Sequence, residues 1–194
     1  MAFRELTNIS ETILVKTCEY VLENSITDFT PMKISSVIGA SEYTIYRYFK
    51  NKDNLLKEAF LFSARKMING LFRIMAIRGL NLIMFSKNVL DFLTENALYS
   101  NFITAYSGSG NYKSSIGQQF VFDYCVVFLK GSLFGKKYSV NELSVILELY
   151  FYRLFSFNDA LYFQRIPKNE STMSYFEGLV KPLYEYIYKG GDND

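Results

Sequence analysis

The sequence predicts an all-α protein of about nine helices. Only three of its 194 residues are proline and eleven are glycine, so few positions interrupt a helix. Apolar residues recur at three- and four-residue steps, whereas the alternation typical of β-strands is hard to find. An apolar fraction of 49% is ordinary for a globular protein with a buried core.

The first two helices are marked by an apolar stripe and by a Thr-Pro pair. From Ile9 onward, apolar residues follow a helical period with one buried face, and the helix is expected to end near Asn24 and Ser25. Thr30 then offers a hydroxyl as N-cap, and Pro31 suits the first helical position because its missing N–H would be unpaired there anyway. The second helix is expected to end at about residue 37.

Two further helix starts follow closely. Gly39 suits the end of the short helix, and Ser41 is an N-cap for another short helix over 42–48. Asn51 is the next N-cap and opens a long helix to about residue 77, with Asp53 complementing the helix dipole. The residues expected to pack the two short helices together are Ile34, Val37, Ile45 and Phe49.

Five more helices are expected beyond Gly79, with boundaries taken from the apolar periodicity. They cover residues 82–96, 100–106, 115–134, 139–163 and 171–189. Loops are expected at 107–111, at 135–138 and around Pro167. Pro182 lies inside the last helix and is expected to kink it, because proline removes a backbone hydrogen bond.

Composition excludes several kinds of site. The chain has no histidine, so zinc sites of the Cys/His type, histidine-based triads and histidine-ligated haem are excluded. Cys18 and Cys125 lie far apart on apolar segments and are expected to be buried thiols in a reducing cytoplasm. The N-terminus lacks the apolar stretch of a signal peptide, and no apolar run approaches the roughly twenty residues that span a bilayer. We therefore expect a cytoplasmic protein with no metal, cofactor or membrane partner.

An enzyme is one alternative class. Gly131 to Lys136 looks like a phosphate loop, but it has one residue too few between its glycines and no preceding strand. Without histidine no nucleophile has an evident base, so no catalytic residues are expected.

A second alternative is a helical adaptor that binds protein or membrane surfaces through its aromatic residues without specific DNA recognition.

The two short helices and their tight turn form a helix-turn-helix, the geometry that places a recognition helix in the DNA major groove. A net charge of +2 is too small to argue for DNA binding, so binding must rest on local charge. Hydroxyls and cations suited to phosphates and base edges gather between residues 43 and 52. The pattern alone also fits a helical hairpin with a solvated basic face.

The stretch from Ile13 to Leu56 resembles, without a gap, the DNA-binding domain of the tetracycline-repressor (TetR) family. The resemblance rests on TPMKI at 30–34, IGAS at 38–41 and, most specifically, TIYRYFKNKDNLL at 44–56. It implies a homodimeric, ligand-responsive repressor of a palindromic operator; an activator would share the same fold. The implied domains are a helix-turn-helix DNA-binding domain of three short helices over 1–54 and a helical effector-binding and dimerisation domain over 55–194.

The resemblance also implies which residues contact DNA. They are Thr30, Ser41, Glu42, Tyr43, Thr44, Tyr46, Arg47, Tyr48 and Lys52. Residues 42–44 occupy the positions that face base edges in the resembled family. Tyr46, Tyr48 and Lys52 match positions that usually contact the DNA backbone. Family members usually have a small residue in place of Tyr43 and often a basic or amide side chain in place of Glu42, so the operator sequence does not transfer.

The rest of the chain is expected to dimerise and to sense a small molecule. The last two helices would form a four-helix bundle with a second copy, as in the resembled family, although both could simply be core. Aromatic residues make up 18% of the chain without any tryptophan. With the resemblance, a subset is expected to line a pocket for a lipophilic effector of unknown identity. These candidates are Phe62, Met67, Phe102, Tyr106, Phe120, Asp123 and Tyr124.

Overall fold

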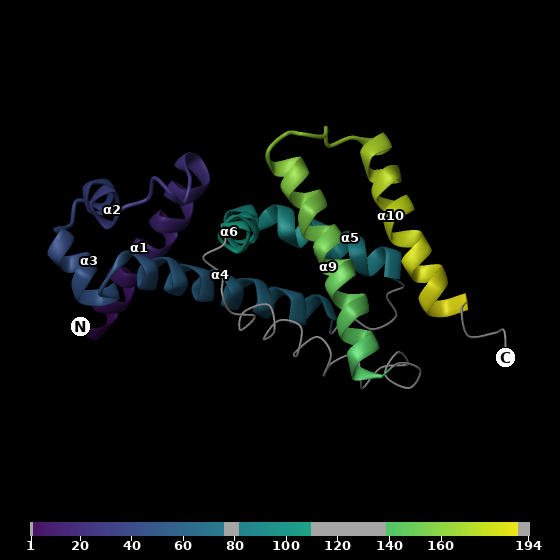
Figure 1. The fold of residues 1–194 in the computed structure, drawn as a ribbon, viewed down its shortest axis with the longest axis horizontal. Helices are drawn as coiled ribbons and strands as arrows, with labels where there is room; N and C mark the ends of the chain where they lie inside the picture. The colour runs from purple at the N-terminus through teal and green to yellow at the C-terminus, as the bar shows by residue number, and fades with distance from the viewer. Residues whose placement is uncertain (1, 76–81, 110–138, 190–194) are drawn as a thin grey trace. The chain divides into compact units, whose positions relative to one another are not determined.

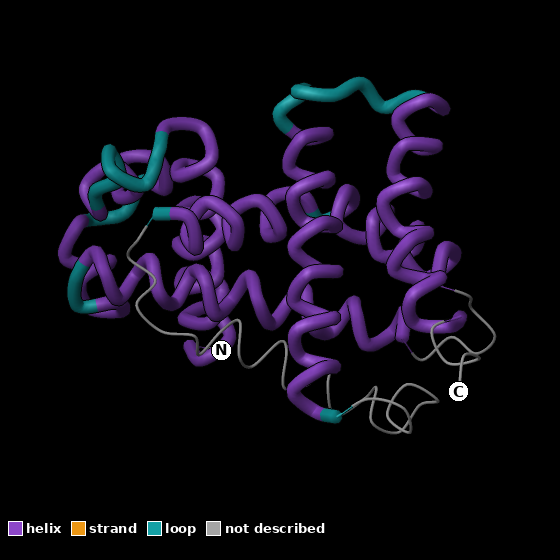
Figure 2. Tube along the Cα trace, turned by 45° about the vertical axis from the view of Figure 1, so that its right-hand side comes forward, coloured by secondary structure: helices purple, strands orange, loops and turns teal. Residues whose placement is uncertain are grey.

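The computed structural model describes residues 2–75, 82–109 and 139–189. Every regular element in these ranges is a helix, and the tube in Figure 2 contains no strand there. The prediction of an all-α protein is confirmed, and the eight helices of the described ranges come close to the number expected. The helix predicted over 115–134 lies outside the described residues.

The helices, labelled as in Figure 1, follow the predicted order. They are α1 (Ala2–Asn24), α2 (Pro31–Ile38), α3 (Glu42–Phe49), α4 (Lys52–Met75), α5 (Leu82–Glu95), α6 (Ala97–Gly108), α9 (Val140–Tyr162) and α10 (Glu170–Lys189). The first helix begins well before Ile9 and is therefore not short, and α6 extends beyond the predicted 100–106 at both ends.

The chain divides into two compact units. Unit 1 contains α1, α2, α3, residues 52–67 of α4, and α6 from Leu98 onward. Unit 2 contains residues 68–75 of α4 together with α5, α9 and α10. The predicted DNA-binding segment 1–54 lies within unit 1, which also includes residues from the segment assigned to effector binding.

Capping residues fix the helix boundaries of the helix-turn-helix. The Ser41 side chain accepts a hydrogen bond from the Thr44 backbone N–H at 3.2 Å, and Gly39 ends α2 with a left-handed φ of 66°. Asn51 caps α4 by accepting from the Asn54 N–H at 2.8 Å. The prediction for Thr30 was partly wrong: its backbone is extended as a cap requires, but its hydroxyl forms no capping hydrogen bond.

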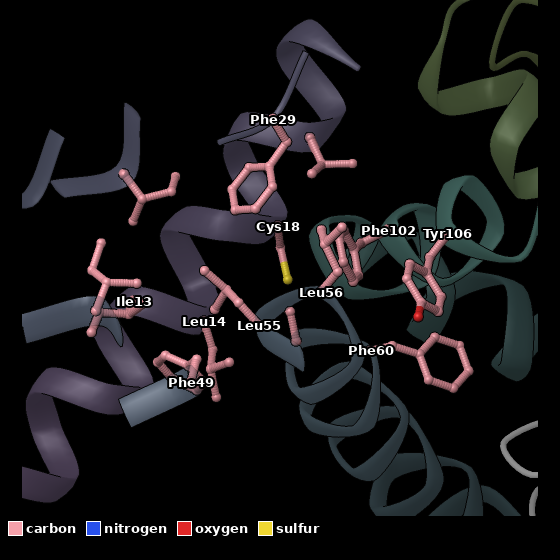
Figure 3. Packing of buried hydrophobic residues seen from close by; sticks show 14 residues of the cluster. Ile13, Leu14, Cys18, Phe29, Phe49, Leu55, Leu56, Phe60, Phe102 and Tyr106 are labelled. Carbon is pink, nitrogen blue, oxygen red and sulfur yellow. The ribbon is translucent and has the colours of Figure 1, made fainter. Parts of the chain in front are cut away.

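Apolar side chains from all five helical segments of unit 1 form its core. Figure 3 shows Cys18 of α1 beside Phe29, Leu55 and Leu56, with Phe60 of α4 facing Tyr106 of α6. The Phe60 and Tyr106 ring centroids are 5.2 Å apart. The apolar stripe predicted for the first helix is therefore the surface on which the other helices of unit 1 pack.

One predicted packing residue of the helix-turn-helix is not buried. Ile34, Ile45 and Phe49 are buried as expected, but Val37 is 58% exposed. The buried stripe of α2 runs through Pro31, Ile34 and Ser35. Ile34 forms one edge of this stripe, and Val37 lies beyond that edge, on the side away from Pro31 and Ser35. Including Val37 among the packing residues was therefore wrong.

In unit 2, α9 and α10 lie side by side in opposite directions, as Figures 1 and 2 both show. Their rings meet at Phe157 and Phe176, with centroids 4.9 Å apart. Helix α5 contacts both, and its buried Ser86 hydroxyl lies 2.7 Å from the hydroxyl of Tyr150 on α9. The two C-terminal helices thus have one face in the core of this unit.

Candidate nucleic-acid interface

Helices α2 and α3 form the predicted helix-turn-helix. Only residues 39–41 separate them, and the Ala40 N–H donates to the Ser35 carbonyl at 3.0 Å across the end of α2. Ile45 and Phe49 anchor α3 through its buried side. The opposite side of α3 is therefore free to face a partner.

That outward face of α3 consists of Tyr43, Tyr46, Arg47 and Lys50, all of them exposed. Spacings of three and four residues from Tyr43 place Tyr46 and Arg47 on the same side of the helix, and Lys50 follows as the C-cap residue. Three of them were predicted to contact DNA. Lys50 lies in the predicted run of hydroxyls and cations over 43–52, but it was not among the predicted DNA contacts.

Tyr43 is the most exposed large hydrophobic side chain in the described part of the chain, at 74%. It sits in the first turn of α3, directly after Glu42 and the capping Ser41. Because the adjacent turn is held by the cap, the Tyr43 ring projects from a fixed backbone. The outward face of α3 therefore begins with an aromatic ring rather than with a charged side chain.

Glu42 and Tyr46 form a pair one helical turn apart. The pKa of Tyr46 is raised first by partial desolvation, and then by hydrogen bonding to Glu42 and by the negative charge of the Glu42 carboxylate. Glu42 is half-buried. Their four-residue spacing predicts that the two side chains are neighbours on one side of the helix.

Arg47 is positioned by the ring of Tyr48. Its guanidinium lies 5.3 Å from the ring centroid, and its Nη2 is 3.5 Å from the Tyr48 hydroxyl. Tyr48 is half-buried and packs against the core of unit 1. The Tyr48 ring therefore packs against the Arg47 guanidinium, and Arg47 remains exposed on the outward face of α3.

Two lysines converge on the loop that leads into α2. Lys33 Nζ donates to the Asp28 carbonyl at 2.7 Å, and Lys52 Nζ donates to the Thr27 carbonyl at 3.4 Å. Thr30, at the N-terminus of α2, is exposed and its hydroxyl is not used for capping. Lys33 was missed by the sequence analysis, because its position depends on the path of the loop.

Ser41 and Thr44 are engaged in local structure. Their hydroxyl oxygens are 2.9 Å apart, and Ser41 also caps the helix. Ser41 is exposed and Thr44 is half-buried. Their first role is to fix the start of α3, which positions Tyr43 between them.

The predicted effector-binding residues fall in two groups. Phe102 and Tyr106 are buried in the core of unit 1, and Phe62 packs against that core at its edge. Met67 is also buried. The remaining candidates, Phe120, Asp123 and Tyr124, lie outside the described residues.

Metal sites and membrane spans are both absent from the described ranges. No group of three or more metal-ligating side chains occurs there that could hold a metal ion. No helix in those ranges is long and apolar enough to cross a membrane.

The arrangement of helices matches solved structures over nearly the whole chain. A TetR family transcription regulator from Marinobacter aquaeolei has a TM-score of 0.72 at 14% sequence identity, covering 94% of this chain and 98% of that one. The TetR family regulator PfmR from Thermus thermophilus has a TM-score of 0.62 at 13% identity, covering 93% and 99%. The fatty acid degradation regulator FadR from Bacillus halodurans has a TM-score of 0.60 at 17% identity, covering 95% and 96%.

Comparison by sequence does not detect the similarity that comparison by structure detects. No family model matches the sequence, and a search of curated proteins finds no similar one. The structural likeness nevertheless extends far beyond residues 13–56, which carry the resemblance in sequence. The chain has the fold of the TetR-family transcription regulators.

Proposed function

We propose that this chain is a DNA-binding transcriptional regulator that acts as a homodimer on a palindromic operator, most simply as a repressor released by a small lipophilic molecule. The observation that carries the proposal is the outward face of α3, defined by Tyr43, Tyr46, Arg47 and Lys50, on a helix-turn-helix within a TetR-like fold. This face combines two aromatic rings, two hydroxyls and two cations, which suit base edges and phosphates.

In the proposed complex α3 enters the major groove and the N-terminus of α2 meets the DNA backbone. Thr30 supplies a hydroxyl that is not used for capping, next to the positive end of the α2 dipole. Lys33 of α2 and Lys52 of α4 bring their ammonium groups to the loop that precedes Thr30. Arg47 and Lys50 add charge on α3. These contacts position the helix, while sequence is read by the residues of its first turn.

Dimerisation is proposed through α9 and α10. Val145 and Leu149 on α9 are each 56% exposed, and Tyr175 on α10 is 64% exposed. Their helices already bury another face within unit 2, so a second apolar face suits a partner. Two helices from each copy would form a four-helix bundle and set two recognition helices whole turns of DNA apart.

Effector release is proposed to act through α4, which has residues in both units. The candidate contacts Phe62, Met67, Phe102 and Tyr106 lie in unit 1 on α4 and α6. A ligand that binds more tightly when these helices are in the arrangement that does not bind DNA lowers the population of dimers that can bind it. The size of this shift is set by the difference between the ligand's affinities for the two arrangements. The test is to titrate lipophilic acids and cations into the protein–DNA complex; release by one class supports the proposal, and no release by either opposes it.

The DNA-binding proposal is tested by selecting bound duplexes from a random-sequence library with the full chain. We expect a palindromic motif whose half-site centres are separated by about 10 base pairs or whole multiples of that turn. Transcription in vitro from a promoter that contains the motif should fall when the protein is added; a rise would indicate an activator.

Two variants locate the binding face. Arg47→Ala should lose at least about tenfold in affinity for the selected duplex, in the range of one lost charged contact. Arg65→Ala is the matched control, because Arg65 is an exposed cation on α4 outside the helix-turn-helix. Enrichment of no sequence would contradict the proposal and favour an adaptor that binds proteins instead.

A further inference from the structure

The outward face of α3 leads with an apolar group. Within the described part of the chain, the Tyr43 side chain forms no hydrogen bond, ion pair or ring contact, and the residue is 74% exposed. Its polar neighbours have partners on the protein: the Thr44 hydroxyl oxygen lies 2.9 Å from that of Ser41, and the Arg47 guanidinium lies over the Tyr48 ring. Tyr43 is therefore the side chain of the first turn that is free to meet a base.

The major groove contains one apolar feature that distinguishes base pairs. Thymine carries a methyl group at C5, whereas the other base edges present donors and acceptors. An exposed ring on the first turn of a recognition helix is placed to cover that methyl, since the N-terminal residues of such helices approach base edges. Burying the methyl against the ring removes apolar surface of both from water.

We infer that Tyr43 is a specificity-determining residue that selects a thymine at one fixed position of each half-site by packing its ring against the C5 methyl. The inference rests on the proposed DNA-binding function and deepens it. It assigns the ring, rather than the hydroxyl, as the reading group. The selected motif should therefore contain an invariant thymine in each half.

The test replaces each thymine of the selected duplex by deoxyuridine, one position at a time. This change removes only the methyl and keeps the base pair and its hydrogen bonds. At the position read by Tyr43 the affinity of the full chain should fall about fourfold for one half-site, the value of one buried methyl-sized group, and about fifteenfold when both halves are changed. Other positions should change less.

Two variants assign the effect to the ring. Tyr43→Phe keeps the ring and should keep the difference between thymine and uracil. Tyr43→Ala should bind both duplexes equally, and its exposed position predicts unchanged thermal unfolding.

Four outcomes would overturn the inference. A motif without a fixed thymine, equal affinity for all uracil duplexes, or loss of discrimination in Tyr43→Phe would each reject it while leaving sequence-specific binding intact. Failure to enrich any sequence would reject the proposed function and this inference together.

Discussion

Each of the two helices of the helix-turn-helix ends at a residue with a positive φ. Gly39 has φ 66° at the end of α2, and Lys50 has φ 63° at the end of α3. A left-handed φ is unstrained for glycine and costs other residues about 1 kcal/mol. The two positions therefore differ in how well their residue fits the backbone.

Exchanging the two residue types should give opposite effects. Gly39→Ala should lower the free energy of unfolding by about 1 kcal/mol, and Lys50→Gly should leave it unchanged or raise it by up to about 1 kcal/mol. Chemical denaturation of both variants checks this. Equal destabilisation by the two changes would show that their φ values do not control stability.

The thiol of Cys18 is predicted to be inert in the folded protein. Burial raises its pKa to about 12, and its sulfur lies 3.4 Å from the Ser63 hydroxyl. Because the folded pKa exceeds the ordinary value of 9.0, this group stabilises the fold below that pH, and the contribution is lost as pH rises toward 12.

A Cys125→Ser variant leaves Cys18 as its single thiol. A thiol reagent at mildly alkaline pH should not modify the folded variant within the time that denatured protein needs for complete reaction. Fast modification without unfolding would contradict the buried position.

Residue roles were predictable where the signal is local. The caps at Ser41 and Asn51 follow from side-chain chemistry next to a helical period, and both were predicted correctly. The contacts of Lys33 and Lys52 could not be predicted, because they depend on how the loop at 27–28 folds back. Val37 was misplaced because apolar character alone does not decide which side of a short helix is buried.

At the scale of elements, α4 and α5 pack closely at a glycine in unit 2. A Cβ added to Gly70 would lie 1.9 Å from Cζ of Phe92, closer than atoms can approach. Gly70→Ala would ordinarily stabilise a helix by about 1 kcal/mol. Here we expect it to destabilise the protein by about 1 to 3 kcal/mol, because the ring must move.

The control for this prediction is the same change in a Phe92→Ala background. With the ring removed, Gly70→Ala should become stabilising, and this reversal of sign is measured by thermal or chemical unfolding of the four proteins. Destabilisation by Gly70→Ala in both backgrounds would show that Phe92 is not the obstacle.

The outer faces of α9 and α10 should control dimerisation. Leu149→Lys places a charge in the proposed interface, so it should shift the protein from dimer to monomer in sedimentation analysis. Met84→Lys is the matched control, because Met84 is a similarly exposed apolar residue on α5. Dimers that withstand Leu149→Lys, or monomers produced equally by both variants, would place the interface elsewhere.

Helix boundaries were predictable where the apolar periodicity and the capping residues lie close together in the sequence. The ends of α1 and α3 and the start of α9 lie within a residue of prediction, and Ser139 forms a complete capping box with Glu142. The early start of α1 and the length of α6 were missed, because neither extension continues a clear stripe or ends at a strong cap.

For the whole molecule, the assignment of α6 to unit 1 shows what local patterns cannot provide. Residues from Leu98 onward pack with the N-terminal helices, and Phe62 and Tyr99 meet with centroids 5.7 Å apart. That contact joins segments distant in the sequence and depends on the packing of the complete unit. The fold class and the helix-turn-helix, by contrast, followed from periodicity and from a short resembling segment.

Charge sets the expected strength of DNA binding. Residues 1–60 carry seven basic and eight acidic side chains, so the domain as a whole does not attract DNA. The cations placed to meet phosphates are Lys33, Arg47, Lys50 and Lys52. A dimer with four such cations in each module has eight. Since each neutralised phosphate contributes about 0.9 to the slope of log affinity against log salt, that slope is at most about seven in magnitude.

Sequence-specific DNA binding is tested most simply by a fluorescence-anisotropy titration of the full chain against its selected duplex and a scrambled duplex at two salt concentrations. We predict two chains per duplex, a preference of at least about a thousandfold for the selected sequence, and a salt slope within the limit set by these four cations. Equal affinity for the two duplexes would contradict the claim that α3 reads a DNA sequence.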